Sequence, residues 1–203
     1  MSLLDSIHGG FIHKRRLGML SDYLAKVLFE NESVLDMGCG DGQLAFLIQS
    51  KRPDITITGI DVLVRSTAAI PVMEFDGKHI PFSNGSFDVV TIIDVLHHTV
   101  DPMILLREAV RVARIGLVIK DHLRQGVLAS PTLRLMDWVG NARHGVALYY
   151  NYWSPAQWFR AFDALGLRPK VWKDQLGLYR FPFNSLFERS LHFLTLLEKP
   201  QPF

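Results

Sequence analysis

The sequence predicts an α/β fold in which a mostly parallel sheet lies between two layers of helices. Strand-like and helix-like segments alternate along the chain, as in proteins with parallel sheets and crossover helices. The expected strands are continuous apolar runs, as a sheet covered on both faces requires. One strand–turn–helix unit is clear in the sequence. A strand that includes residues 34–35 is followed by glycines at 38, 40 and 42, and apolar residues at helical spacing begin after Gln43. This order is typical of a Rossmann-like three-layer sandwich with a nucleotide site at the carboxyl edge of the sheet.

The first half of the chain supplies the early strands and helices of this fold. Leucines at helical spacing predict a helix over 12–29. The link between Asp61 and the strand expected at 72–75 is short and contains Pro71, so we expect a turn or two there instead of a full helix. The other elements expected in this half are strand 33–37, helix 42–50 and strand 55–60.

The second half of the chain completes a seven-stranded sheet. A continuous apolar run predicts a strand over 87–93, and Pro102 directly after Asp101 favours the start of a helix. The pair at 154–155, serine and proline, is a second helix start signal. The remaining expected elements are strand 114–120, helix 132–141 and strands 168–173 and 191–198, with a loop over 178–183.

Length and composition agree with a single domain. The chain has 203 residues and a formal net charge of +2, which is too small to indicate nucleic-acid or membrane binding by itself. No secretory signal pattern is present at the N-terminus, and no run reaches the roughly 18 apolar residues of a membrane span. We therefore expect a cytoplasmic protein without stable membrane insertion. Its expected parts are an N-terminal helix (1–30), a cofactor-binding core (31–122), an inserted lid (123–153) and C-terminal strands (154–203).

The glycine turn distinguishes between kinds of cofactor. Dinucleotide-binding loops need Gly-x-Gly-x-x-Gly, but here the third glycine comes one residue early and position 43 is Gln. Asp36 and Asp41 flank the turn, and carboxylates there would repel a pyrophosphate and suit a cationic ligand. S-adenosylmethionine (SAM), a sulfonium without phosphate, is the cofactor that these charges favour.

Further segments resemble class I SAM-dependent methyltransferases, in particular their small type 11 branch. Beyond the turn at 34–42, Asp61 closes a second β-rich run. The segment Phe75-Asp-Gly-Lys-His-Ile-Pro-Phe82 is similar to the family's adenine-binding segment, and 86–98 is similar to a fourth strand that ends at the cofactor. A single glycine turn is weak evidence, whereas four such segments in family order are specific. The resemblance covers roughly residues 30–122.

The resemblance implies which residues contact SAM. Asp61 would accept hydrogen bonds from both ribose hydroxyls, and Asp76 would accept one from the adenine amino group. The implied set is Asp36, Gly38, Cys39, Gly40, Asp61, Val62, Asp76, Gly77 and Asp94, and no metal ion is expected. Asp36 could instead cap the helix that follows. We interpret Cys39, the only cysteine, as a small packed residue and not as a catalytic thiol.

Methyl transfer depends mainly on in-line geometry, and a base is needed only where the acceptor loses a proton. The candidates lie at the carboxyl ends of strands: His97 and His98 after the fourth strand, Asp121 and His122 after the fifth. We rank His122 first and His98 second, with packing as the alternative role of His98. Neighbouring strand residues point to opposite faces, so Asp121 and His122 are not expected to pair.

Residues 123–153 are long for a connection in this fold and predict a helical lid over the methyl acceptor. They are rich in aromatic side chains, with His144, Asn151 and Tyr152 as polar groups among them. Such a mixture fits a pocket for a small, partly apolar molecule, and these three residues are the candidate substrate contacts. Ordinary packing of the aromatic side chains is the alternative.

Several sequence features bear on functions of other classes. No Asn/Asp-Pro-Pro-Tyr follows the fourth strand, which argues against methylation of nucleic acid, and the glycine spacing argues against an NAD-dependent oxidoreductase. A non-catalytic SAM-binding or interaction protein would keep the same cofactor residues. The basic cluster at 13–16 could reach an anionic lipid or a substrate phosphate, although a solvated helix face is the simpler interpretation. The favoured function is SAM-dependent methyl transfer to a small molecule.

Overall fold

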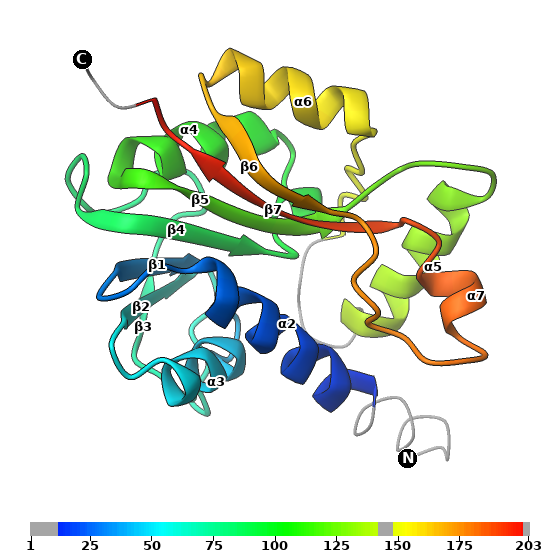
Figure 1. The fold of residues 1–203 in the computed structure, drawn as a ribbon, viewed down its shortest axis with the longest axis horizontal. Coiled ribbons are helices and arrows are strands. Elements are labelled where there is room, and N and C mark those ends of the chain that lie inside the picture. Colours follow the sequence, from blue (N-terminus) through cyan, green and yellow to red (C-terminus); the bar gives the residue numbers. More distant parts are fainter. Residues whose placement is uncertain (1–11, 142–147, 201–203) are drawn as a thin grey trace.

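A sheet of seven strands forms the centre of the protein, which a computed structural model describes over residues 12–141 and 148–200 (Figure 1). The strand order is β3-β2-β1-β4-β5-β7-β6, in which only β7 runs antiparallel to its neighbours. The strands are β1 (Ser33–Met37), β2 (Thr56–Asp61), β3 (Val72–Glu74), β4 (Phe87–Ile93), β5 (Ala113–His122), β6 (Arg168–Lys173) and β7 (His192–Glu198). The predicted mostly parallel, seven-stranded α/β fold is confirmed.

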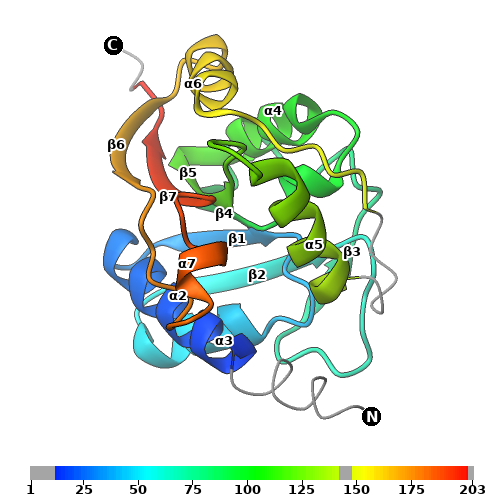
Figure 2. The same cartoon turned by 90° about the vertical axis from the view of Figure 1, so that its right-hand side faces the viewer.

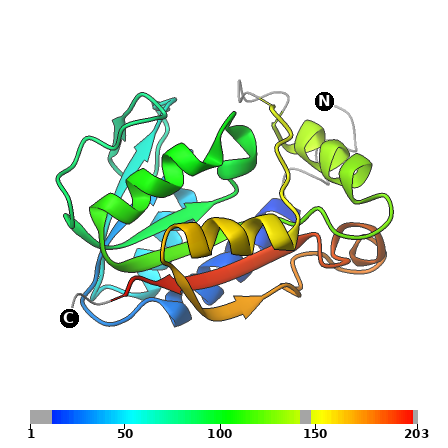
Figure 3. The same ribbon diagram turned by 90° about the horizontal axis from the view of Figure 1, so that it is seen from above.

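Helices cover both faces of the sheet, which gives the three layers seen in Figures 2 and 3. The helices α2 (His13–Val27) and α3 (Gln43–Lys51) pack on one face. The helices α4 (Pro102–Val112) and α6 (Pro155–Ala164) pack on the other. No helix within the described residues is long and apolar enough to cross a membrane.

Consecutive residues of β5 point into opposite layers. Leu117 belongs to the core cluster that contains Leu106 of α4 and Phe162 of α6. The next residue, Val118, belongs to the cluster that contains Leu24 of α2. All five side chains are fully buried. The strand therefore needs apolar residues on both faces, which explains the continuous apolar run in its sequence.

The helix start signals act as predicted. Before α4, the Asp101 carboxylate accepts the N–H of Met103 at 2.9 Å, and Pro102 takes the first helical position. Before α6, Ser154 and Gln157 form a reciprocal capping box. Each cap satisfies backbone N–H groups that the first turn of a helix leaves without an intrahelical acceptor.

β4 ends at Ile93, as predicted, and the chain then forms a 3-10 turn, η2 (Leu96–His98), which the sequence did not predict. β5 is longer than the predicted strand 114–120, because β7 pairs with it as far as His122, which lies opposite His192. The turn and the longer strand bring the histidines of η2 and β5 to the same edge of the sheet.

Two helices lie together beyond the carboxyl end of β5 (Figure 1). The helix α5 (Ala129–Asn141) begins at residue 129 instead of 132 and forms the inserted helical lid that the sequence predicts. The helix α7 (Asn184–Phe187) contacts α5 and has no counterpart in the prediction. On the other side of the sheet, residues 62–71 contain no helix, as expected.

At Gly116 the strands β5 and β7 are too close for any side chain. A Cβ added there would lie 2.0 Å from the backbone oxygen of Leu197. Because overpacking a core costs about 1–3 kcal/mol, we expect Gly116→Ala to lower Tm by roughly 2–12 °C in a chain of this size. Gly18→Ala in α2, where the added Cβ meets nothing within 4 Å, is the control and should not lower Tm. Thermal unfolding followed by circular dichroism compares the two, and a wild-type Tm for Gly116→Ala would contradict the close approach.

Candidate functional site

The glycine turn after β1 is packed at both ends and open in the middle. Gly38, Gly40 and Gly42 have φ angles of 75°, 61° and 70°, which other residues rarely adopt. A Cβ on Gly38 would collide with Val95, and a Cβ on Gly42 would collide with Ile70. A Cβ on Gly40 would meet nothing within 4 Å. The turn therefore leaves space for a ligand against the backbone of Gly40.

Asp61, at the end of β2, connects this turn to the neighbouring strand. Its Oδ2 accepts the N–H of Gly40 at 2.8 Å, and its Oδ1 accepts the N–H of Leu63 at 2.9 Å. The following residue, Val62, is 56% exposed, and its Cγ1 would lie 3.0 Å from a Cβ added to Gly77. The residues expected to contact ribose and adenine thus form one continuous row along the strand ends.

Asp76 lies at the far end of this row on an exposed turn. Its Oδ1 accepts the backbone N–H groups of Lys78 and His79 at 2.7 and 2.6 Å, and its Oδ2 lies 3.1 Å from Nδ1 of His79. These bonds stabilise the ionised form and lower the pKa of Asp76 to about 2. Asp76 is therefore a fixed, charged acceptor at neutral pH.

A cavity of about 160 Å³ lies between the glycine turn and α2. Asp36, Gly38 and Asp94 line it from the sheet, and Arg16 and Leu17 line it from the helix. Together with Cys39, four of the residues predicted to bind the cofactor are therefore brought together around one hollow, at the carboxyl ends of β1 and β4.

Asp36 and Cys39 are shielded side chains on the wall of this cavity. The hydroxyl of Thr91 donates to Asp36 Oδ1 at 2.8 Å, and burial raises the pKa of Asp36 to about 6. Asp36 does not cap α3, because the N-cap is Gly42 and the carboxylate that accepts the N–H of Gln43, at 3.1 Å, is that of Asp41. Cys39 lies against Gly59, and burial raises the pKa of its thiol, which favours the uncharged form.

Two cations hold the carboxylate of Asp94. Lys120 of β5 is completely buried, and its ammonium donates to Oδ1 of Asp94. Arg16 of α2 donates to Oδ2 at 3.2 Å. Burial alone would raise the pKa of Asp94, but these cations keep it below its usual value. The backbone of Asp94 has a φ of 57°, which is uncommon outside glycine and marks a constrained position.

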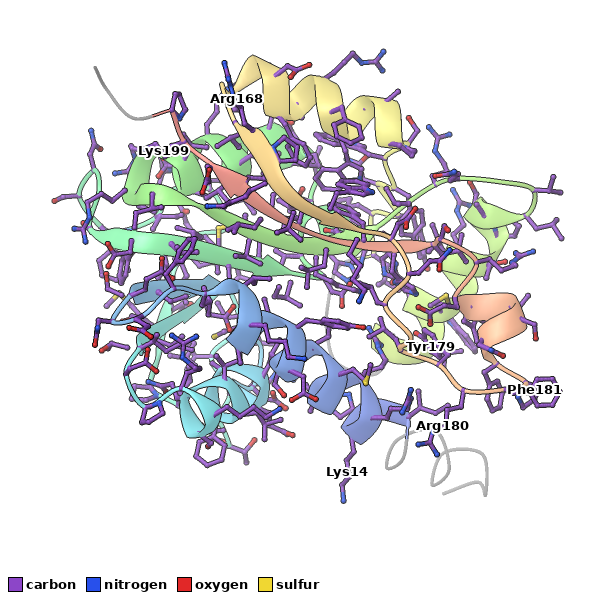
Figure 4. All side chains as sticks on the ribbon, in the orientation of Figure 1. Lys14, Arg168, Tyr179, Arg180, Phe181 and Lys199 are labelled. Carbon is purple, nitrogen blue, oxygen red and sulfur yellow. The ribbon has the colours of Figure 1, made fainter. Side chains whose placement is uncertain are left out.

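The basic cluster at 13–16 is not a uniform solvated face. Lys14 points away from the protein into solvent (Figure 4). The guanidinium of Arg16, in contrast, lies 5.9 Å from the centre of the Tyr179 ring. Tyr179 is on the loop that precedes α7. Arg15 donates to the carbonyl of Gly177 in the same loop at 2.9 Å. The two arginines therefore fasten α2 to the C-terminal part of the chain.

A second polar group, hereafter the histidine cluster, lies beside Asp94. It consists of His97 on η2, Asp121 and His122 at the end of β5, and Asp137 on α5, all of them buried. His97 Nδ1 lies 2.5 Å from Asp121 Oδ1. Burial opposes a charge on His97, but Asp121 raises its pKa to about 10. Asp121 therefore pairs with His97, and its carboxylate takes no part in a side-chain pair with His122, as expected.

Asp137 connects the lid to this cluster. Its Oδ1 lies 3.4 Å from His97 Nε2 and 3.5 Å from His122 Nε2. The hydroxyl of Tyr152 donates to its other oxygen. Tyr152 itself is 6% exposed and packs with Leu133 under α5. This tyrosine therefore belongs to the packing beneath α5, and its contact with a substrate stays a prediction.

The other predicted substrate and base residues lie at the border of the cluster. Asn151 donates its backbone N–H to the carbonyl of His97 at 3.0 Å and its side-chain amide to the carbonyls of Thr99 and Val100 at 3.2 and 3.1 Å. It thereby holds the segment before α6 against η2. His98 is half-buried, and burial lowers its pKa to about 4. His144 lies outside the described residues.

Sequence reasoning missed Arg16, Lys120 and Asp137 as site residues and did not select His97 among the preferred bases. For two of these four residues, Lys120 and Asp137, the sequence contained a signal. Lys120 ends a continuous apolar run that had been assigned to a buried strand, and Asp137 is the one acidic residue in α5. A charged residue among buried ones needs a partner.

A family model described as a methyltransferase domain matches residues 11–170 of the chain. The chain belongs to this family. The predicted relationship to class I SAM-dependent methyltransferases is thereby confirmed, and SAM is the cofactor that the family and its solved relatives imply.

Curated and solved relatives agree with this assignment. The 27-O-demethylrifamycin SV methyltransferase of Amycolatopsis mediterranei is 31% identical over 112 residues, which are 48% of this chain and 41% of that protein. The ubiquinone biosynthesis O-methyltransferase of Paracidovorax citrulli is 32% identical over 118 residues, 52% of this chain and 48% of that protein. The matches thus span less than half the length of either relative. A SAM-dependent methyltransferase from Aquifex aeolicus has the same fold, with a TM-score of 0.63 at 18% identity over 93% of this chain and 97% of that one.

The open position in the glycine turn can be tested with a bulky side chain. We expect Gly40→Val to abolish SAM binding, because its side chain would fill the space beside the backbone. Gly85→Val is a matched control, since Gly85 also has a positive φ (63°) and open space around its Cβ. Both variants should lose a similar stability of about 1–3 kcal/mol from backbone strain. Calorimetric titration with SAM compares them, and retained binding by Gly40→Val would show that the turn is only a connection.

The raised pKa of Asp36 predicts a pH dependence of SAM binding. A sulfonium favours the ionised carboxylate, so SAM affinity should be full above about pH 6 and fall as the pH drops below it, by up to about tenfold per pH unit. S-adenosylhomocysteine has a neutral sulfur and should show a weaker dependence. Titrations of both ligands between pH 5 and 7.5 measure the difference, and Asp36→Asn should remove it. Parallel profiles for the two ligands in the wild type would contradict a contact between Asp36 and the sulfonium.

Proposed function

We propose that this protein transfers a methyl group from SAM to a hydroxyl group of a small, partly apolar molecule. The observation that carries the proposal is the position of the 160 Å³ cavity. Asp94 lines this cavity, and its Oδ1 also lies 3.8 Å from Nε2 of His122 in the histidine cluster. A methyl donor in the cavity and an acceptor beside the cluster would meet at the carboxyl ends of β4 and β5. This is the usual place of ligands in open α/β sheets.

The residues around the cavity fit SAM. The carboxylates of Asp36 and Asp94 suit a sulfonium and an ammonium group, and the exposed face of Val62 suits an adenine ring. Arg16 Nε has no hydrogen-bond partner among the described residues, so the guanidinium can also take the carboxylate of the methionyl part. When bound, SAM supplies a methyl group that is already activated for transfer. The protein's task is then to place the acceptor in line with it.

Within this proposal the candidate bases have different roles. His98 is the proton acceptor, because it is the partly exposed histidine of the group and its lowered pKa keeps it neutral at pH 7. Asp121 is completely buried and accepts bonds from Leu96 N at 3.0 Å and His122 N at 2.7 Å besides that of His97. Asp121 is therefore a positioning residue for His97, and His122 lies too deep to reach an acceptor without movement of α5.

Exposed aromatic side chains in the inserted segment support the proposal that the methyl acceptor is partly apolar. Trp138 and Tyr149 are 60% and 56% exposed, which is unusual for large aromatic side chains unless they meet a ligand or a partner. The names of two relatives point to the same chemistry, since one acts on 27-O-demethylrifamycin SV and the other is an O-methyltransferase of ubiquinone biosynthesis. A hydroxylated aromatic or quinone-like compound is the acceptor class we propose.

The decisive test measures cofactor binding and transfer separately. Hydrogen bonds to a charged group contribute about 1.5–3 kcal/mol, so we expect Asp61→Ala to weaken SAM binding by roughly 10- to 150-fold. Asp163→Ala on the exposed side of α6 is the control and should bind SAM normally. Calorimetry gives the affinities, and transfer of labelled methyl from SAM to a panel of hydroxylated aromatic compounds reports activity.

The two outcomes of this test separate the proposed function from its alternative. Unchanged affinity in a folded Asp61→Ala variant would remove Asp61 from the cofactor site. Normal SAM binding without transfer to any oxygen acceptor would favour a non-catalytic SAM-binding protein with a methyltransferase fold.

A further inference from the structure

We propose that His97, His122 and Asp137 bind a divalent transition-metal ion such as Zn²⁺, with Asp94 as a fourth ligand. The four residues come from η2, β5, α5 and the turn after β4, so the ion would join the lid helix to the sheet. The ligand atoms of Asp94, His97 and His122 lie within 4.8 Å of one another. The site differs from the sequence prediction, which included no metal, and it does not rest on the proposed methyl transfer.

The two distances from Asp137 to the histidines are those expected between ligands of a tetrahedral metal ion. Asp137 Oδ1 lies 3.4 Å from His97 Nε2 and 3.5 Å from His122 Nε2, and Asp94 Oδ1 lies 3.8 Å from His122 Nε2. With Zn–N and Zn–O bonds of about 2.0–2.2 Å, two ligands of a tetrahedral ion are about 3.3–3.6 Å apart. Asp94 and Asp137 belong to two overlapping groups of possible ligands, Asp94 with His97 and His122, and Asp137 with His97 and His98. Binding of one ion by all four residues therefore requires the two groups to move together.

These distances do not match a hydrogen-bonded network. A charged imidazolium and a carboxylate attract each other to about 2.7–2.9 Å. The Nε2 atom of His97 is buried and has no hydrogen-bond partner among the described residues, and the same holds for Nδ1 of His122. Buried polar atoms without a partner are rare and call for an explanation. A cation between the two rings and Asp137 would satisfy His97 Nε2 directly.

The surroundings orient the proposed ligands as a metal site requires. Asp121 accepts a hydrogen bond from His97 Nδ1, with the two atoms 2.5 Å apart, so a metal ion that displaces the proton of Nε2 would meet a lone pair directed at the site. Tyr152 donates to Asp137 Oδ2 and leaves Oδ1 for the ion. Metal-binding histidines commonly have such a carboxylate partner on their second nitrogen.

The charges of the region also favour a bound cation. Three carboxylates, those of Asp94, Asp121 and Asp137, face two permanent cations, Lys120 and Arg16. With neutral histidines the group has one negative charge in excess. A proton on His97 neutralises this charge, and a divalent ion in place of that proton gives the group a net charge of +1. The 3.4 Å separation between His97 Nε2 and Asp137 Oδ1 favours the ion. Two imidazole nitrogens and carboxylate oxygens are donors that suit Zn²⁺ and its neighbours in the transition series.

Metal binding can be measured directly on the full chain without SAM. The protein is treated with EDTA, dialysed and titrated with Co²⁺, whose visible bands are intense in tetrahedral and weak in octahedral coordination. We expect about one tetrahedral Co²⁺ per chain, displaced by Zn²⁺. Zn²⁺ should also raise the Tm of the EDTA-treated protein, because it binds the folded state.

Four variants test the ligand assignment. His122→Ala and Asp137→Asn should weaken Co²⁺ binding at least about tenfold, and Tyr152→Phe should weaken it by about 10- to 100-fold through the orientation of Asp137. His79→Ala is the matched control, because His79 is also paired with a carboxylate but is exposed and follows β3, which β2 and β1 separate from β4 in the sheet. Asp137→Asn and Tyr152→Phe preserve side-chain shape, so they decide the question if His122→Ala does not fold.

Each contrary result overturns the proposal. Absence of tetrahedral Co²⁺ bands in the folded wild-type chain, with no effect of Zn²⁺ on Tm, would show that the cluster is an ion-pair network only. Weak octahedral bands that all variants share would show adventitious binding at the surface. Equal affinity in His122→Ala, Asp137→Asn and the wild type would place the ion elsewhere.

Discussion

The buried ammonium of Lys120 is the constraint on which the centre of this protein depends. An unpaired charge in a protein interior costs several kcal/mol, so the end of β4 has to present a carboxylate to it. Asp94 does so by adopting a left-handed backbone conformation directly after the strand. The same carboxylate then receives Arg16, which brings α2 against the sheet. The cavity beside the glycine turn exists because this helix is held there.

The two functional regions share this ion pair and are coupled through it. Asp94 borders the proposed donor cavity on one side and the histidine cluster on the other. A positive charge that enters the cavity competes with Lys120 and Arg16 for the same carboxylate, and interactions of this kind are strong where water is excluded. Occupation of the donor site should therefore change the electrostatic environment of His97 and His122 without any movement of the backbone.

The fold could be predicted from the sequence because its signals are local. Strand runs, glycine spacing and the caps at Asp101 and Ser154 each depend on a few neighbouring residues. The same holds for the residues expected to contact the cofactor, since Gly40 lies in the turn after β1 and Asp61 is the last residue of the neighbouring strand β2. The histidine cluster is different, because Asp137 meets His97 and His122 only after α5 has folded back over the sheet. No local pattern encodes such a contact, and the prediction found single members without their partners.

The position of β7 governs the order in which the sheet can be assembled. The strand is made after β6, yet it lies between β5 and β6, and β6 pairs with the sheet only through it. While the chain is being synthesised, residues 168–173 have no neighbouring strand to pair with until 192–198 have emerged. Up to that moment the open edge of β5 can pair with other chains. The time to protect this protein from aggregation during synthesis is therefore the interval between the emergence of β5 and that of β7.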